Sequence, residues 1–195
     1  RALHGLLAVG LACLSLLLPV SSQARTVYHV DLHLEQGMID PGIATFVERV
    51  IEEAEEAGAE AIVLDIDTFG GRGDAATVIR DAVLDAKPMT IAFVDKRAIS
   101  AGALISLACT KIVMTQGASI GAATAVDGTT GEKASDKVIS YFRAEMRATA
   151  ERRGRDPRIA EAMGESASHR PPPRPPAAPM AKASTVSVSV TPRCL

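Results

Sequence analysis

Hydrophobic and polar residues along the chain follow two different periods, and these predict strands and helices in turn. Residues 26–34 alternate apolar and polar side chains, as a half-buried strand does. Asp40 and Pro41 form a good helix start, and apolar residues then recur at helical spacing from Ala44 to Glu60. Residues 61–67 are a nearly continuous apolar run, which is typical of a buried parallel strand.

The same alternation continues along the chain. We expect a helix from about Ala75 to Ala86, a strand from Thr90 to Val94, a helix opening at Ser100, a short strand Lys111–Met114 and a helix from about Asp136 to Arg153. Residues 95–99 are expected to form an exposed turn. Strands that alternate with helices indicate an α/β fold with a mainly parallel sheet flanked by helices. Ligands in such sheets bind beyond the carboxyl ends of the strands, where Gly70-Gly71 and Ser100 stand.

Both ends of the chain differ from this pattern. Residues 1–24 begin with a basic residue, continue through an apolar run of 16 residues and end on Ser22-Gln23-Ala24, which predicts a secretory signal peptide. An uncleaved anchor is the alternative, although a membrane-spanning helix needs about 20 residues. Residues 165–195 hold seven of the eleven prolines and are predicted to be a disordered Pro-rich tail. One folded domain is therefore expected over residues 25–164.

Composition narrows the classes of function. The 195 residues are 47% apolar and only 3% aromatic, so we expect an aliphatic core. A net charge of −2 gives no overall attraction to nucleic acid, and we expect no nucleic-acid partner. The three cysteines form no Cys-x-x-Cys pair, which supports neither a disulfide framework nor a zinc site. We therefore expect neither a metal nor a cofactor.

Ser100 is the first candidate for chemistry. It stands where a strand ends and a helix begins, followed by the small residues Ala101 and Gly102. A hydroxyl there lies at the positive end of a helix dipole, and the unpaired N–H groups of the first turn can hold an oxyanion. The alternative role of a serine at a helix start is that of a simple N-cap.

A serine nucleophile needs a base. Two of the four histidines fall in the predicted signal and tail, and the other two stand in the first strand. A lysine can serve instead when burial lowers its pKa. Lys137, at the start of a helix, is the best placed, although a lysine on a helix is usually a solvated surface charge. The less suitable candidates are His29, His33, Lys133 and Lys111.

Gly70-Gly71 follows a buried strand and has two interpretations. Glycines in this place often only permit a tight turn. They also let backbone N–H groups face a substrate carbonyl or a peptide strand. The pair is not a phosphate loop, because no Gly-Lys-Ser/Thr pattern follows.

Five segments together carry a resemblance to a known family. They are residues 35–41, 63–71, 98–102, 117–122 and 137–142. In this order they resemble the NfeD-type membrane-bound serine proteases, relatives of Clp protease and signal peptide peptidase A. The resemblance covers about residues 26–164 and implies the ClpP/crotonase fold.

The resemblance also implies a mechanism. It makes Ser100 the nucleophile and Lys137 the general base of a Ser-Lys dyad. The backbone N–H groups of Gly71 and Ala101, together with Gly70, would form the oxyanion hole. The expected substrate is a polypeptide, in particular apolar segments of membrane proteins such as stomatin-like partners. We expect a homo-oligomer on the extracytoplasmic or periplasmic side of the membrane.

Two departures from the family pattern stand out. Phe69 replaces the usual proline of Asp-Thr-Pro-Gly-Gly, and the family continues beyond the equivalent of Glu165 with more of the protease domain. We therefore expect the C-terminal part of the domain to be missing, which leaves a catalytically impaired binding module as the alternative function. A crotonase-fold enzyme acting on acyl-CoA is a third class, which the predicted signal segment opposes.

Overall fold

The computed structural model describes residues 25–34, 38–127 and 130–165. The chain divides into two units, residues 1–165 and 166–195, and only the first contains described residues. The predicted signal peptide and almost all of the predicted tail lie outside the described residues and stay predictions. Among the described helices, none is both long enough and apolar enough to span a bilayer.

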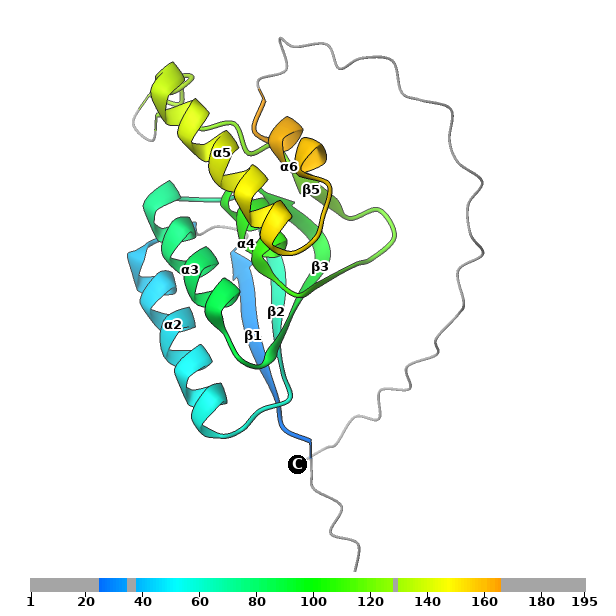
Figure 1. The fold of residues 1–195 in the computed structure, drawn as a ribbon. Coiled ribbons are helices and arrows are strands. Elements are labelled where there is room, and N and C mark those ends of the chain that lie inside the picture. Colours follow the sequence, from blue (N-terminus) through cyan, green and yellow to red (C-terminus); the bar gives the residue numbers. More distant parts are fainter. Residues whose placement is uncertain (1–24, 35–37, 128–129, 166–195) are drawn as a thin grey trace, which may run out of the picture. The chain divides into compact units, whose positions relative to one another are not determined.

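A parallel sheet forms the centre of the domain (Figure 1). Its main path runs β1-β2-β3-β4, and β5 also pairs with β3. All of these pairings are parallel, as the buried apolar run of β2 predicts. The strands are β1 (Val27–Leu34), β2 (Ala61–Thr68), β3 (Met89–Ile99), β4 (Lys111–Met114) and β5 (Ser119–Gly121).

Helices flank this sheet, so the expected fold class is confirmed. Helix α2 begins at the predicted place, because the Asp40 carboxylate accepts the Ile43 N–H at 2.9 Å. Helices α2, α3 and α4 pack in sequence beside one another, and α5 lies across α3 and α4 (Figure 1). The core between helices and sheet is aliphatic, as the composition predicts. The helices are α2 (Pro41–Glu56), α3 (Gly73–Asp85), α4 (Ala101–Ala108), α5 (Asp136–Arg152) and α6 (Pro157–Met163).

Strand β3 corrects one expectation. The predicted turn over residues 95–99 is wrong, because β3 continues to Ile99 and Ser100 follows directly. The register between the strands explains the error. Ile66 pairs with Val94 and Thr68 with Ala98, so one residue of β2 between these pairs lies opposite three residues of β3. The extra residues form a β-bulge, whose polar side chains give the local sequence the character of a turn.

Candidate functional site

Ser100 occupies a sharp turn between β3 and α4. Its φ of 54° and ψ of −113° lie in a region that residues other than glycine rarely adopt, at a cost of roughly 1–3 kcal/mol. Its side chain makes no capping hydrogen bond to α4, so the simple N-cap role is wrong. A strained strand-to-helix turn that presents a serine hydroxyl is the geometry of a nucleophile elbow.

Backbone contacts hold this turn in place. The Ser100 N–H donates to the Gly121 carbonyl at 2.9 Å, and the Ser100 carbonyl accepts the N–H of Ala103 at 3.0 Å. The N–H groups of Ala101 and Gly102 stand in the first turn of α4, where no helical carbonyl precedes them. The Ala101 N–H is therefore suited to hold an anion beside the serine, as expected for an oxyanion hole.

Gly70 lies directly beside Ser100. A Cβ atom on Gly70 would stand 2.7 Å from the Ser100 Cβ and 3.2 Å from its Oγ, and its φ of 117° also favours glycine. The Gly70 N–H donates to Thr68 Oγ1 at 3.1 Å. In this structure Gly70 therefore provides space for the serine, while its own N–H is already engaged.

Gly71 presents a different arrangement. It forms an isolated parallel bridge with Ile39, in which the Ile39 N–H donates to Gly70 O at 2.9 Å and the Arg72 N–H donates to Ile39 O at 2.8 Å. Successive peptide groups of an extended strand point to opposite sides, so the Gly71 N–H faces away from Ile39. The sequence suggests the N–H groups of Gly70, Gly71 and Ala101 as donors to an oxyanion. Because the Gly70 N–H already donates to Thr68, the N–H groups of Gly71 and Ala101 are the better candidates.

Lys137 lies in the first turn of α5 with an exposed side chain. Within the described part of the chain, no hydrogen bond or ion pair joins it to Ser100. The nearby packing of α5 is tight, because a Cβ atom on Gly73 would stand only 2.2 Å from the Phe142 ring. This contact brings the second turn of α5 against the segment that follows Gly71. The Ser100–Lys137 dyad stays a prediction.

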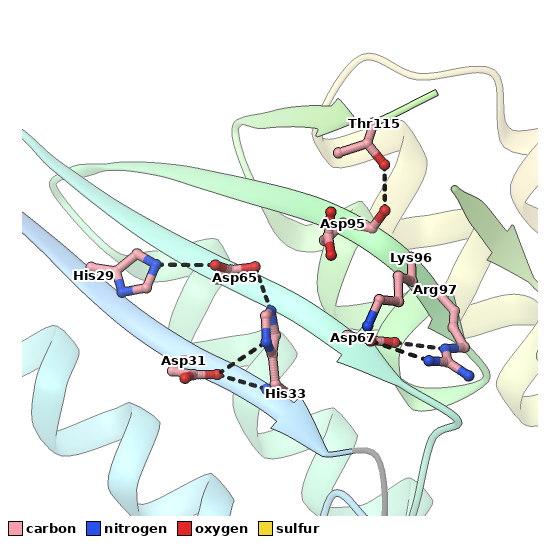
Figure 2. Close-up of polar contacts among 9 residues, drawn as sticks. All are labelled: His29, Asp31, His33, Asp65, Asp67, Asp95, Lys96, Arg97 and Thr115. Carbon is pink, nitrogen blue, oxygen red and sulfur yellow. Dashed lines mark hydrogen bonds and ion pairs between the residues drawn. The ribbon is translucent and has the colours of Figure 1, made fainter. Parts of the chain in front are cut away.

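The other candidate bases have different surroundings. His29 Nε2 lies 3.2 Å from Asp65 Oδ2, and His33 Nε2 lies 2.8 Å from Asp65 Oδ1, on the exposed face of β1 and β2 (Figure 2). The hydrogen bond to Asp65 raises the pKa of His33. Lys133 forms an ion pair with Asp136 at 3.4 Å, and Lys111 is exposed on β4. Among the described residues, no hydrogen bond or ion pair joins any of these four side chains to Ser100.

The patterns in the sequence do not predict one ion pair near the site, which joins Asp67 and Arg97. Asp67, at the end of β2, is buried and accepts hydrogen bonds from Arg97 Nε at 2.7 Å and Nη2 at 3.2 Å (Figure 2). The Arg97 guanidinium holds the pKa of Asp67 below its ordinary value and lies 4.4 Å from the centre of the Phe69 ring. The signal that could have found the pair is spacing, since Asp67 and Arg97 stand three residues before Gly70 and Ser100 respectively.

Comparison with known sequences assigns relatives to the chain. Residues 26–177 match the model of the NfeD1b N-terminal domain family. Membrane protein NfeD1b of Bacillus subtilis is 37% identical over 160 residues, which cover 80% of this chain and 36% of that protein. Membrane-bound protease PH1510 of Pyrococcus horikoshii is 36% identical over 121 residues, covering 58% of this chain and 27% of that protein. The chain thus matches between about a quarter and somewhat more than a third of the length of these curated relatives.

Solved structures share its fold. A lysine-to-alanine mutant of the 1510-N membrane-bound stomatin-specific protease, in complex with a substrate peptide, superposes with a TM-score of 0.66 at 32% identity over 72% of this chain and 66% of that chain. ClpP1 from Listeria monocytogenes gives a TM-score of 0.52 at 19% identity over 70% of this chain and 78% of that one, which concerns the fold alone. The expected ClpP-like fold is confirmed.

Proposed function

The chain belongs to the NfeD1b family through a match to its N-terminal domain, and from this we propose that it is an extracytoplasmic, membrane-associated serine endopeptidase. The relatives that match it are membrane proteins, and one is a protease. The extracytoplasmic location rests on the predicted signal segment at residues 1–24. The single observation that carries the catalytic part of the proposal is the strained position of Ser100 beside Gly70.

In this mechanism Ser100 Oγ attacks the carbonyl carbon of the scissile peptide bond, and its proton passes to the Lys137 amine. The N–H groups of Gly71 and Ala101 bind the oxygen that becomes negative. The C–N bond then breaks, and the leaving amine takes the proton from Lys137. A water molecule repeats the sequence on the acyl ester and frees Ser100. Donors aimed at such an oxyanion are each worth about 10²–10³-fold in rate.

Lys137 completes the site only when its amine reaches Ser100 Oγ, within about 2.6–3.2 Å. Geometry without substrate is often looser, because catalytic hydrogen bonds tighten when the complex forms. We propose that the first turn of α5 brings the amine to the serine when a peptide is bound. The contact of Phe142 with Gly73 supports this, since it holds the next turn of α5 beside the glycine loop.

For the substrate, we propose apolar segments of membrane proteins, with stomatin-like proteins as the first to test. One relative is named as stomatin-specific and was solved with a substrate peptide. The surface beside the proposed site fits an apolar peptide, because Met38 and Phe69 are each 59% exposed and flank the bridge between Ile39 and Gly71. We further propose that the chain acts as a homo-oligomer.

A fluorophosphonate probe tests the proposal on the full chain. It should label wild-type protein at Ser100, and Ser100→Ala should abolish both labelling and peptide cleavage, since removing a nucleophile costs several orders of magnitude in rate. Lys137→Ala should be equally inactive, because the two residues act as a unit. Lys133→Ala is the matched control, a neighbouring exposed lysine paired with Asp136, and should retain activity. Unchanged labelling of Ser100→Ala would refute the assignment.

The second candidate is a non-catalytic module that binds a membrane protein. The exposed side chain of Lys137, without a hydrogen bond to Ser100 in the described residues, favours it. Such a module would bind a stomatin-like segment with equal affinity in wild type and Ser100→Ala, and neither protein would react with the probe.

A further inference from the structure

Asp67 and Arg97 join the two strands that carry the proposed site. The side chain of Asp67 is only 2% exposed, and Arg97 donates to both of its carboxylate oxygens in a fork (Figure 2). Asp67 stands three residues before Gly70 on β2, and Arg97 stands three residues before Ser100 on β3. The pair therefore links the segment of β2 that leads to the glycine loop with the segment of β3 that leads to Ser100.

The ion pair lies at the β-bulge of β3. Between the pairs Ile66–Val94 and Thr68–Ala98, the single residue Asp67 on β2 faces three residues on β3. A bulge interrupts the regular backbone ladder and redirects side chains, often next to active sites. Here the Asp67 carboxylate binds both cationic side chains of the bulge, with Lys96 Nζ at 3.5 Å and Arg97 Nε at 2.7 Å. These contacts join β2 and β3 where the ladder between them is interrupted, while Arg97 also pairs with Ser119 of β5 on the other side of the strand.

The position of this bulge determines where β3 ends. A slip of the register by one residue moves the strand by about 3.3 Å along its axis, and it would carry Ser100 away from Gly70. A misplacement of about 1 Å can cost on the order of 100-fold in rate. Because Ser100 and Gly70 are already in close contact, their relative position leaves little tolerance.

Phe69 adds a second contact to Arg97. Its ring lies against the Arg97 guanidinium with the cation 4.4 Å from the ring centre. A cation is attracted to an aromatic face, and loss of Arg97 would leave the charge of the buried Asp67 carboxylate uncompensated. Both effects oppose an alternative placement of Arg97.

We propose that the Asp67–Arg97 pair is a positioning unit, which sets the bulge and thereby the distance between the Gly70-Gly71 loop and the Ser100 hydroxyl. The inference rests on the proposed function, because its catalytic consequence requires Ser100 to be the nucleophile. Neither residue touches the substrate in this scheme. Both act through the backbone that follows them.

The test compares Asp67→Asn, Arg97→Gln and the double variant in the full chain. Fluorophosphonate labelling is resolved into a binding constant and a rate constant for phosphonylation, in which the serine oxygen bonds to phosphorus and fluoride leaves. We expect each single variant to lose on the order of 100-fold in the phosphonylation rate with little change in probe binding. The double variant should lose no more than Asp67→Asn alone, because Asp67→Asn already breaks the contacts of the carboxylate with both Arg97 and Lys96.

Two further variants make the comparison specific. Glu55→Gln removes a carboxylate from the Glu55–Lys87 ion pair, which has an N–O distance of 2.7 Å and lies near the start of β3, away from Ser100. It should label at the wild-type rate. Arg97→Lys retains the charge but loses the bidentate contact, and we expect an intermediate phosphonylation rate.

Wild-type phosphonylation rates in folded Asp67→Asn and Arg97→Gln would overturn the inference, and so would losses that add in the double variant. If Arg97→Gln does not fold, Arg97→Lys with an unchanged phosphonylation rate would overturn it equally. If the wild-type chain is not labelled at all, the proposed function fails, and amide hydrogen exchange over residues 99–102 decides the positioning role separately. Faster exchange there in Asp67→Asn than in Glu55→Gln supports the role, and equal exchange overturns it.

Discussion

Replacing Ser100 with glycine should make the protein more stable while it abolishes the proposed activity. The backbone at φ 54° and ψ −113° costs a residue with a side chain roughly 1–3 kcal/mol, and glycine largely avoids this cost. Ser100→Ala keeps the strain and also removes the hydroxyl, so it is the proper reference. Glycine gains about 0.4–1 kcal/mol of extra freedom in the unfolded chain, which opposes the effect. We therefore expect the free energy of unfolding of Ser100→Gly to exceed that of Ser100→Ala by roughly 1–2 kcal/mol.

Urea unfolding of the full-length variants measures this difference, together with thermal unfolding, where the expected shift is about 2–8 °C. Ser106, in the interior of α4, provides the opposite control, because Ser106→Gly should be less stable than Ser106→Ala by up to about 1 kcal/mol. Ala122, the other described non-glycine residue with positive φ, at 49°, provides a positive control, and Ala122→Gly should be stabilising. A Ser100→Gly variant no more stable than Ser100→Ala would show that the elbow is not strained.

Three further predictions concern groups elsewhere in the domain. Burial raises the pKa of Cys109 to about 12, so iodoacetamide should modify it, as mapped by peptide mass spectrometry, only after the chain unfolds. The hydrogen bond to Asp65 raises the pKa of His33, so its stabilising contribution is present below about pH 6.5 and is lost as the pH rises through the higher folded value. His33→Gln should flatten the dependence of the urea midpoint on pH above about pH 6.5. An unchanged dependence would contradict a stabilising interaction of protonated His33 with Asp65. Gly71→Ala should lose labelling and about 1–3 kcal/mol of stability, because its Cβ would stand 2.2 Å from the backbone oxygen of Ile39.

The parts of the fold that the sequence predicts best are those set by local patterns. The sequence predicts helix α5 over about residues 136–153, and the helix spans Asp136–Arg152, because its apolar spacing and its boundaries are encoded within the segment itself. Helix α2 begins after Asp40 for the same reason, since an aspartate followed by a proline both caps and starts a helix. The place of Ser100 at the start of a helix is encoded locally as well, although the strained backbone of the turn is not.

Long-range features escaped prediction for a physical reason. The extension of β3 depends on pairing with Thr68 on β2 and with β5, and periodicity within residues 95–99 carries no information about either partner. The Asp67–Arg97 pair spans 30 residues of sequence and forms only once the bulge has set the register. Strand β5 and helix α6 are short, so their own periodicity is weak. Such elements are stabilised by what they pack against.

Helix α6 illustrates why these short elements matter to the site. The Ser100 N–H binds the carbonyl of Gly121, and two residues later the Ala123 N–H binds the carbonyl of Met163 at 2.7 Å. Thr124 Oγ1 continues the chain of contacts to the carbonyl of Glu165 at 2.8 Å. A strained backbone persists only where its surroundings hold it. The end of α6 therefore stabilises the turn at Ser100 indirectly, through the segment from Gly121 to Thr124. The strain at Ser100 therefore depends on residues more than 60 positions away in the sequence, which local patterns around the serine do not encode.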